Sequence, residues 1–286
     1  MNTVMSYTFN REQIQAIKHH IEMYGGFLAC GHMDYSMICE MCEFNHYRKG
    51  YMYIKLCQKG LYPISMTTLK RFFLWNKVST VDNLFEDAFI IISAQDLKLL
   101  PVLSKLDALN NRKEQVIIAI DGYAASGKTT LASKLAKIFD GNVFHMDDFY
   151  KKPVINPKDT LSMYGSNIDF DKINDTIVDP ITMQKPVIYH PFNVITHTHI
   201  DPIKIPYRKF IIFEGAYSMH PYMKIAYDYT IFYDISKTLQ IKRIYKRNGF
   251  KKLVKFIHTW IPNEKKYAKK LNIRQKADSV LVEKTT

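Results

Sequence analysis

The clearest chemical pattern in the chain is formed by two glycines, a lysine and a threonine. Gly122, Gly127, Lys128 and Thr129 follow the spacing G-x-x-x-x-G-K-[ST]. Glycine allows backbone conformations that side chains forbid, so successive backbone N–H groups can surround a phosphate. The lysine adds a flexible positive charge, and the threonine hydroxyl can ligate Mg²⁺. The spacing predicts a site for the phosphates of a nucleotide such as ATP.

The residues on either side favour the same interpretation over a glycine-rich turn without a ligand. The apolar, β-branched run 116–120 is typical of a buried strand, and a helical pattern follows over 128–139. The positive N-terminus of that helix would point at the bound anion. We call residues 122–130 the phosphate loop and expect all of them to contact the nucleotide: Gly122, Tyr123, Ala124, Ala125, Ser126, Gly127, Lys128, Thr129 and Thr130.

Strand and helix patterns continue to alternate after the phosphate loop. Strand patterns lie at 142–145, 209–213 and 229–233, and a helix pattern follows at 236–247. Such alternation predicts an α/β fold, a parallel sheet with helices on both faces. Ligands of such sheets bind beyond the carboxyl ends of the strands. Acidic residues stand at these ends: Asp147, Asp148, Glu214 and Asp234.

Phosphoryl transfer needs charged groups of the kinds that gather there. One carboxylate must hold Mg²⁺, directly or through water, and another is useful to take the proton of the accepting hydroxyl. Arg243 and Arg247 are four residues apart, hence on one helical face, and could meet the transferred phosphoryl group from a closing lid. For any one of these side chains, the alternative is a surface ion pair.

Six segments in order resemble motifs of a known family. They are IAIDGYAASGKTT, HMDDFYK, SNIDFDKI, FEGAYSMHP, YDYTIFYDISKTLQIKRIYKRNG and WIPNEKKYAKKLNIRQKADSVL. By these motifs, residues 114–283 resemble the uridine kinase-like branch of P-loop nucleoside kinases. The resemblance implies a P-loop kinase fold and ATP-dependent phosphorylation of a small-molecule hydroxyl, first of all the 5′-hydroxyl of uridine or cytidine. Related members act on nicotinamide riboside, pantothenate or phosphoribulose, which leaves the acceptor open.

The resemblance also implies residue roles. Asp147 would be the general base and, with Thr129 and Glu214, would surround Mg²⁺. Lys128 and the two lid arginines, Arg243 and Arg247, would complete the catalytic set. The expected substrate-binding residues are Asp147, Tyr150 and Asp169, with Asp169 on the ribose hydroxyls, together with Tyr189 and His197 of the segment discussed next.

The nucleobase segment PVIYHPFNVITHTH matches the family only in outline. Tyr189, Phe192 and His197 could stack on a base or bond to it. Aromatic packing within a hairpin is the alternative, and both interpretations stay open.

Residues 1–112 have no counterpart in the resemblance. We expect a small, mainly helical N-terminal domain there, with helix patterns at 11–24 and 96–109 and a strand at 89–92, before a P-loop domain at 113–286. Cys39-x-x-Cys42 has the spacing of a zinc site. Cys30 and Cys57, or His46, could complete it, and the alternative is four thiols without a metal.

The net charge of +13 suits an anionic ligand, either a nucleotide or a nucleic acid. Between Lys237 and Lys276 there are fourteen Lys or Arg and one acid, Glu264. A nucleic-acid-binding regulator with a nucleotide-sensing domain is therefore the alternative function. A GTPase switch is disfavoured because the P-loop domain lacks an N-K-x-D motif. Without an apolar run of about 18 residues or a signal-peptide pattern, we expect a cytoplasmic protein with no membrane partner.

Overall fold

The structure is a computed structural model. It describes residues 99–151, 164–193 and 198–283, together with short pieces of the first hundred residues (51–55, 65, 67–68, 71–72 and 89–93). The chain divides into two compact units, Met1–Ala108 and Leu109–Thr285. The predicted domain boundary after residue 112 stays a prediction.

The larger unit is built on a parallel sheet of five strands in the order β11-β10-β3-β9-β4. The central strand and its neighbour β9 are buried along their whole length, which their runs of Ile, Val and Phe explain. The predicted parallel sheet is confirmed, with strand ends shifted by up to two residues. The strands are β3 (Val116–Gly122), β4 (Asn142–His145), β9 (Phe210–Glu214), β10 (Tyr229–Ile235) and β11 (Ser279–Glu283).

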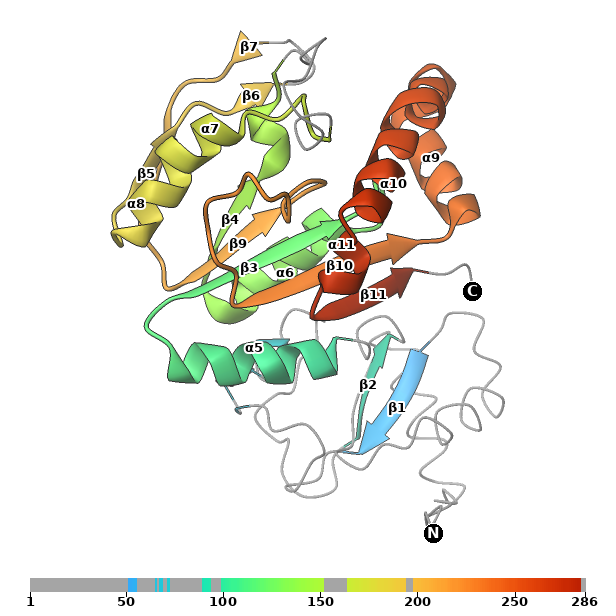
Figure 1. Ribbon diagram of the computed structural model, residues 1–286. Coiled ribbons are helices and arrows are strands. Elements are labelled where there is room, and N and C mark those ends of the chain that lie inside the picture. Colours follow the sequence, from blue (N-terminus) through green and yellow to red (C-terminus); the bar gives the residue numbers. More distant parts are fainter. Residues whose placement is uncertain are drawn as a thin grey trace, which may run out of the picture. The chain divides into compact units, whose positions relative to one another are not determined.

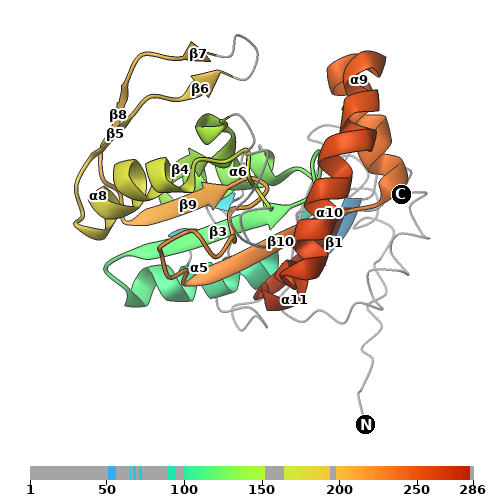
Figure 2. The same ribbon diagram turned by 45° about the horizontal axis from the view of Figure 1, so that its top comes forward.

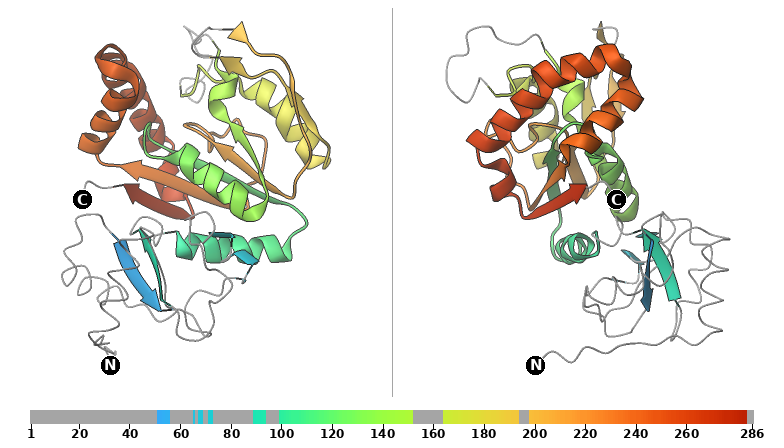
Figure 3. Two further views of the ribbon diagram at one scale, coloured as in Figure 1. Left: turned by 180° about the vertical axis from the view of Figure 1, so that it is seen from behind. Right: turned by 90° about the vertical axis from the view of Figure 1, so that its right-hand side faces the viewer.

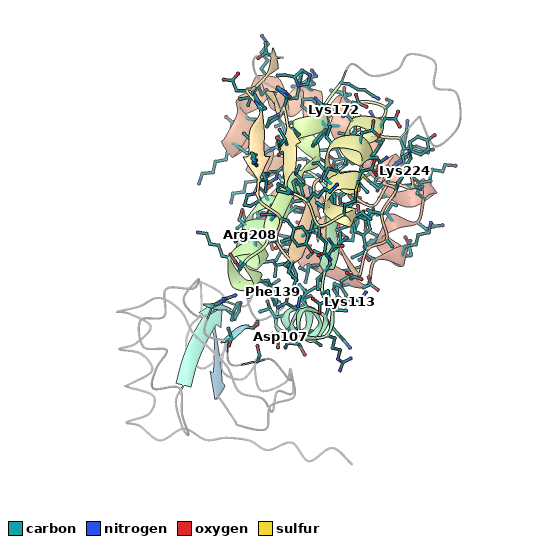
Figure 4. The ribbon with its side chains drawn as sticks, turned by 90° about the vertical axis from the view of Figure 1, so that its left-hand side faces the viewer. Asp107, Lys113, Phe139, Lys172, Arg208 and Lys224 are labelled. Atoms are coloured by element: carbon teal, nitrogen blue, oxygen red, sulfur yellow. The ribbon has the colours of Figure 1, made fainter. Side chains whose placement is uncertain are left out.

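Helices cover both faces of this sheet. Seen from behind, α6 (Lys128–Phe139) lies across one face (Figure 3). Phe139 (labelled in Figure 4) is the last residue of this helix. Its ring stacks on that of Phe210, with centroids 4.6 Å apart. On the other face lie α10 (Ile261–Lys270) and α11 (Ile273–Lys276) (Figures 1 and 2). α9 (Lys237–Lys255) runs beside α10 and joins it through the π-helical turn η3 (Phe256–Trp260).

The helix α9 is longer than predicted. The sequence pattern ended the helix near Arg247, but the helix continues to Lys255 across a kink at Gly249, whose φ is 72°. Glycine tolerates this left-handed conformation, so the chain turns there and the helix resumes.

Between β4 and β9 the chain forms short elements at the edge of the sheet. They are η1 (Met146–Phe149), α7 (Phe170–Ile173), η2 (Asn174–Val178) and α8 (Asp179–Thr182). Two small antiparallel pairs follow, β5 (Val187–Tyr189) with β8 (Ile203–Ile205) and β6 (Phe192–Asn193) with β7 (Thr198–His199). These pairs give the predicted nucleobase segment an extended, hairpin-like form.

The described pieces of the first unit include one antiparallel pair, β1 (Tyr51–Lys55) with β2 (Phe89–Ser93). The predicted strand at 89–92 is confirmed, whereas β1 was not predicted. The helix α5 (Leu100–Arg112) has Pro101 in its first turn, as expected, but runs on through polar residues to Arg112. Asp107 on this helix accepts a hydrogen bond from the Ser65 hydroxyl at 2.8 Å.

The predicted zinc ligands Cys30, Cys39, Cys42, Cys57 and His46 lie outside the described residues, as does the predicted helix at 11–24. Within the described ranges, no helix is long and apolar enough to cross a membrane.

Candidate active site

The phosphate loop joins the central strand β3 to α6, and its two glycines adopt conformations that side chains rarely take. Gly122 has φ 140° and Gly127 has φ 110°. A Cβ atom on Gly122 would lie 2.1 Å from the backbone oxygen of Tyr233 in the neighbouring strand β10. The first glycine of the pattern is therefore required by a close backbone approach as well as by its φ.

The loop leaves several backbone N–H groups available to an anion. The Ser126 N–H donates to the Tyr123 oxygen at 3.2 Å, which closes a turn, and the first bond of the helix runs from Leu131 N–H to the Gly127 oxygen. Over the described residues, the N–H groups of 127–130 have no hydrogen-bond partner. They lie at the N-terminus of α6, where the helix dipole favours a negative charge.

The Lys128 side chain packs against the phosphate loop. It is buried, and Nζ donates to the backbone oxygen of Tyr123 at 3.0 Å. This bond holds the ammonium group beside the unpartnered N–H groups, where it can exchange a carbonyl for a phosphate oxygen.

Side chains from α9 donate hydrogen bonds to backbone carbonyl oxygens of the phosphate loop. Gln240 Nε2 donates to the Ala124 oxygen at 3.0 Å, and Arg243 donates to the oxygens of Ala125 and Ser126 at 3.2 and 3.1 Å. Arg243 also pairs with Glu283. The structure thus brings Arg243 to the phosphate loop, although its guanidinium faces backbone oxygens.

Arg247 is not brought to the loop with Arg243. Its side chain is exposed, and Nε bonds to Asn248 Oδ1 at 2.8 Å. The two arginines were predicted to share a helical face, but Arg243 contacts the phosphate loop and Arg247 bonds to its neighbour Asn248.

A cluster of oxygen ligands lies beside the N-terminus of α6. The Thr129 hydroxyl donates to Glu214 Oε1 at 3.2 Å, and the other oxygen of Glu214 is 2.7 Å from His145 Nδ1. The hydrogen bond to Glu214 is the main cause that raises the pKa of His145. The sequence-based candidates did not include His145. It lies at the end of β4, where it pairs with Glu214 of β9, and a histidine at the carboxyl end of a predicted strand could have marked it as a candidate.

Asp147 follows directly in η1. Desolvation by the surrounding protein and then repulsion by Glu214 raise the pKa of Asp147, while Lys128 and a hydrogen bond from Tyr150 act in the opposite direction. A cation bound between the two carboxylates would relieve their mutual repulsion. A hydroxyl and two mutually repelling carboxylates are donors that suit Mg²⁺.

No group of three or more His, Cys, Asp or Glu side chains in the described part of the chain has the arrangement of a metal site. Thr129, Asp147 and Glu214 supply only two carboxylates, which suits Mg²⁺ because this ion keeps several waters and takes phosphate oxygens as ligands.

On the acceptor side, two of the predicted residues are held by protein contacts. Asp169 caps α7 by accepting the Lys172 N–H at 3.4 Å, and Lys151 Nζ lies 3.3 Å from the same carboxylate oxygen. The Tyr189 hydroxyl donates to Asp148 at 2.7 Å, and its ring stacks on Phe149. Tyr189 is buried, so in this conformation it packs in the hairpin rather than standing open to a base.

Phe192 and His197 are the other two candidates for contact with a base. The Phe192 ring meets His199 edge to face, with centroids 5.5 Å apart. His197 lies outside the described residues.

Two buried acids at the phosphate loop were missing from the sequence-based candidates. Asp121 accepts the N–H groups of Gly122 and Met219 at 2.6 and 3.0 Å and the Tyr267 hydroxyl at 2.7 Å. Glu264 Oε2 accepts the Ala124 N–H at 2.8 Å. The available signals were an aspartate inside an apolar strand and a single acid within a basic segment.

A parallel sheet whose central strand leads through a glycine-rich loop into a buried helix is the architecture of a P-loop kinase. No family model matches the chain. Uridine-cytidine kinase D of Dictyostelium discoideum is 31% identical to the chain over 119 residues, which are 42% of this chain and 23% of that protein. The C-terminal part of the chain thus resembles uridine kinase-like P-loop kinases. The chain spans less than a quarter of the length of this curated relative.

Two solved structures show lower identity. A possible uridine kinase from Bacillus stearothermophilus is 19% identical, covers 63% of this chain and 98% of its own, and has a TM-score of 0.47. The deoxyadenosine kinase from M. mycoides with bound dCTP is 16% identical, covers 59% of this chain and 90% of its own, and has a TM-score of 0.28. The strand order and the loop geometry, rather than these two likenesses, define the fold.

Proposed function

We propose that the chain is a cytoplasmic, ATP-dependent kinase of a small-molecule hydroxyl, with the 5′-hydroxyl of uridine or cytidine as the first candidate acceptor. The observation that carries the proposal is the row of unpartnered N–H groups at 127–130, flanked by Lys128 and by the bonded pair Thr129 and Glu214. A triphosphate would satisfy these donors, and the neighbouring oxygens are suited to its metal ion.

In this proposal, the protein mainly positions the two substrates and neutralises the charge of the phosphates. Lys128 moves from the Tyr123 oxygen to the phosphates. Thr129, Asp147 and Glu214 would hold Mg²⁺, which would supply positive charge beside the transferred group. Asp147 takes the proton of the accepting hydroxyl as the general base. Asp169 holds sugar hydroxyls at the N-terminus of α7.

Charges of both signs lie near Asp147: Asp148 follows it on η1, while Lys128 and His145 act to lower its pKa. Charge therefore favours none of the five acceptors uridine, cytidine, nicotinamide riboside, pantothenate and phosphoribulose.

The test is release of ADP from ATP and Mg²⁺ with each of these five acceptors in turn. We expect turnover with at least one nucleoside and a loss of at least about a hundredfold in Lys128→Ala, which removes the charge on the phosphates. Acceptor-independent hydrolysis, or turnover that Lys128→Ala leaves intact, would refute the proposal.

A second candidate function is the binding of single-stranded nucleic acid along α9 and α10. All but one of the fourteen basic side chains between Lys237 and Lys276 are exposed, and Tyr245 and Phe250 are exposed among them. Lysines track a phosphate backbone, and exposed aromatic rings can stack on unpaired bases. Binding of an RNA oligonucleotide that falls steeply with salt, and that Phe250→Ala weakens, would support it; no binding at low salt would exclude it.

A further inference from the structure

Glu264 is the one acid between Lys237 and Lys276, and its side chain is only 8% exposed. α10 places it against the phosphate loop, where Oε2 accepts the Ala124 N–H at 2.8 Å. From α9, Gln240 bonds to the carbonyl oxygen of the same residue at 3.0 Å. Both backbone polar groups of Ala124 are thus held by side chains of the helical pair, which fixes the first half of the loop.

The Glu264 carboxyl group lies among charges of both signs. Burial raises its pKa to about 7, while attraction to Lys128 and the bond from Ala124 act in the opposite direction. The titratable groups that interact with it from other elements are Lys128 from α6, Asp121 from β3, Asp147 from η1, Tyr123 from the loop, and Tyr150 and Tyr217.

A triphosphate bound to the loop would change this balance in one direction. It adds several negative charges close to Glu264, and it draws Lys128 toward the phosphates. A protonated carboxyl group removes the repulsion, yet its carbonyl oxygen can still accept the Ala124 N–H. Protonation therefore keeps the loop in place while the anion binds.

We propose that Glu264 is a positioning residue of the phosphate loop that takes up a proton from solvent when a triphosphate binds, so that nucleotide affinity falls as the pH rises above neutrality. This inference rests on the proposed binding of ATP and adds a pH dependence to the same site. Ionised Glu264 weakens nucleotide binding through charge repulsion, and neutral Glu264 removes this repulsion.

The test is calorimetric titration of the full chain with ATP and saturating Mg²⁺ in two buffers that differ in ionisation enthalpy. At pH 7.5 we expect uptake of roughly half a proton or more per nucleotide bound, and an affinity that falls by up to about fivefold from pH 7 to 8. Glu264→Gln keeps an oxygen for the Ala124 N–H but cannot ionise, so it should lose most of both effects and bind more tightly at pH 8.

Asp175→Asn is the matched control, because it removes an exposed acid of η2 that makes no contact with the loop. It should behave as the wild type. Equal proton uptake in the wild type and Glu264→Gln would overturn the inference. Should Glu264→Gln fail to fold by circular dichroism, a wild-type affinity that is flat from pH 7 to 8 would overturn it equally. If the wild type binds no nucleotide, the proposed function itself fails; binding without proton uptake refutes only the role of Glu264.

Discussion

Asp147 is the carboxylate proposed to take the proton of the bound hydroxyl, and it lies in η1, directly after β4 and close to Glu214. Asp147→Asn keeps the size of the side chain but removes the proton acceptor. We expect kcat to fall by about 10²- to 10⁴-fold with little change in the fold. Steady-state kinetics with the best acceptor measures this, and Asp171→Asn, an exposed acid of α7, serves as the control. Turnover near that of the wild type would assign the role elsewhere.

Glu264 also makes stability depend on pH. Its pKa is raised from 4.5 to about 7, so at pH values between these the folded chain holds a proton that the unfolded chain has lost. The free energy of unfolding should therefore fall as the pH rises through this window, by on the order of 1–3 kcal/mol from this side chain. Urea unfolding at pH 5 and pH 8 measures the difference. Glu264→Gln should reduce it, and an unchanged difference would contradict the assignment.

At the scale of elements, the first turn of the phosphate loop depends on its contact with β10. In Gly122→Ala, the new Cβ would meet the Tyr233 backbone oxygen at 2.1 Å, at a φ of 140°. A backbone atom cannot rotate away as a side chain can, so we expect a loss of about 2 kcal/mol or more. Gly249→Ala is a matched control, because its Cβ would meet nothing within 4 Å although φ is +72°; it should cost about 1 kcal/mol. Equal losses in urea unfolding would refute the contact argument.

The elements that sequence patterns predicted well are those with a local signature. Apolar β-branched runs marked β3 and β9, and the glycine spacing marked the phosphate loop. The contact between Ala124 and Glu264 joins residues 140 positions apart, and no local pattern encodes such a distance. Likewise, the four-residue spacing placed Arg243 and Arg247 on one face, but only tertiary packing decided that Arg243 faces the loop.

At the scale of the whole molecule, we expect the P-loop unit to fold by itself. Every strand of the five-stranded sheet lies between Val116 and Glu283, and the buried residues of one hydrophobic core cluster lie between Ile117 and Ile273. Just before β3, Lys113 pairs with Asp228, whose other carboxylate oxygen accepts the Ile117 N–H at 2.9 Å. A chain that begins at residue 113 keeps both contacts.

The fragment 113–286 should therefore unfold in one cooperative transition and keep nucleotide binding, with a Kd for MgATP within about threefold of that of the full chain. It loses the bond from Lys209 Nζ to the Asn110 oxygen, an exposed contact whose removal costs about 1 kcal/mol or less. Fragment 123–286 is the negative control, because it lacks the central strand and should not fold. Thermal unfolding followed by circular dichroism, with calorimetric titration of MgATP, decides the matter. Aggregation of 113–286 under conditions in which the full chain is folded would show that the domain begins before residue 113.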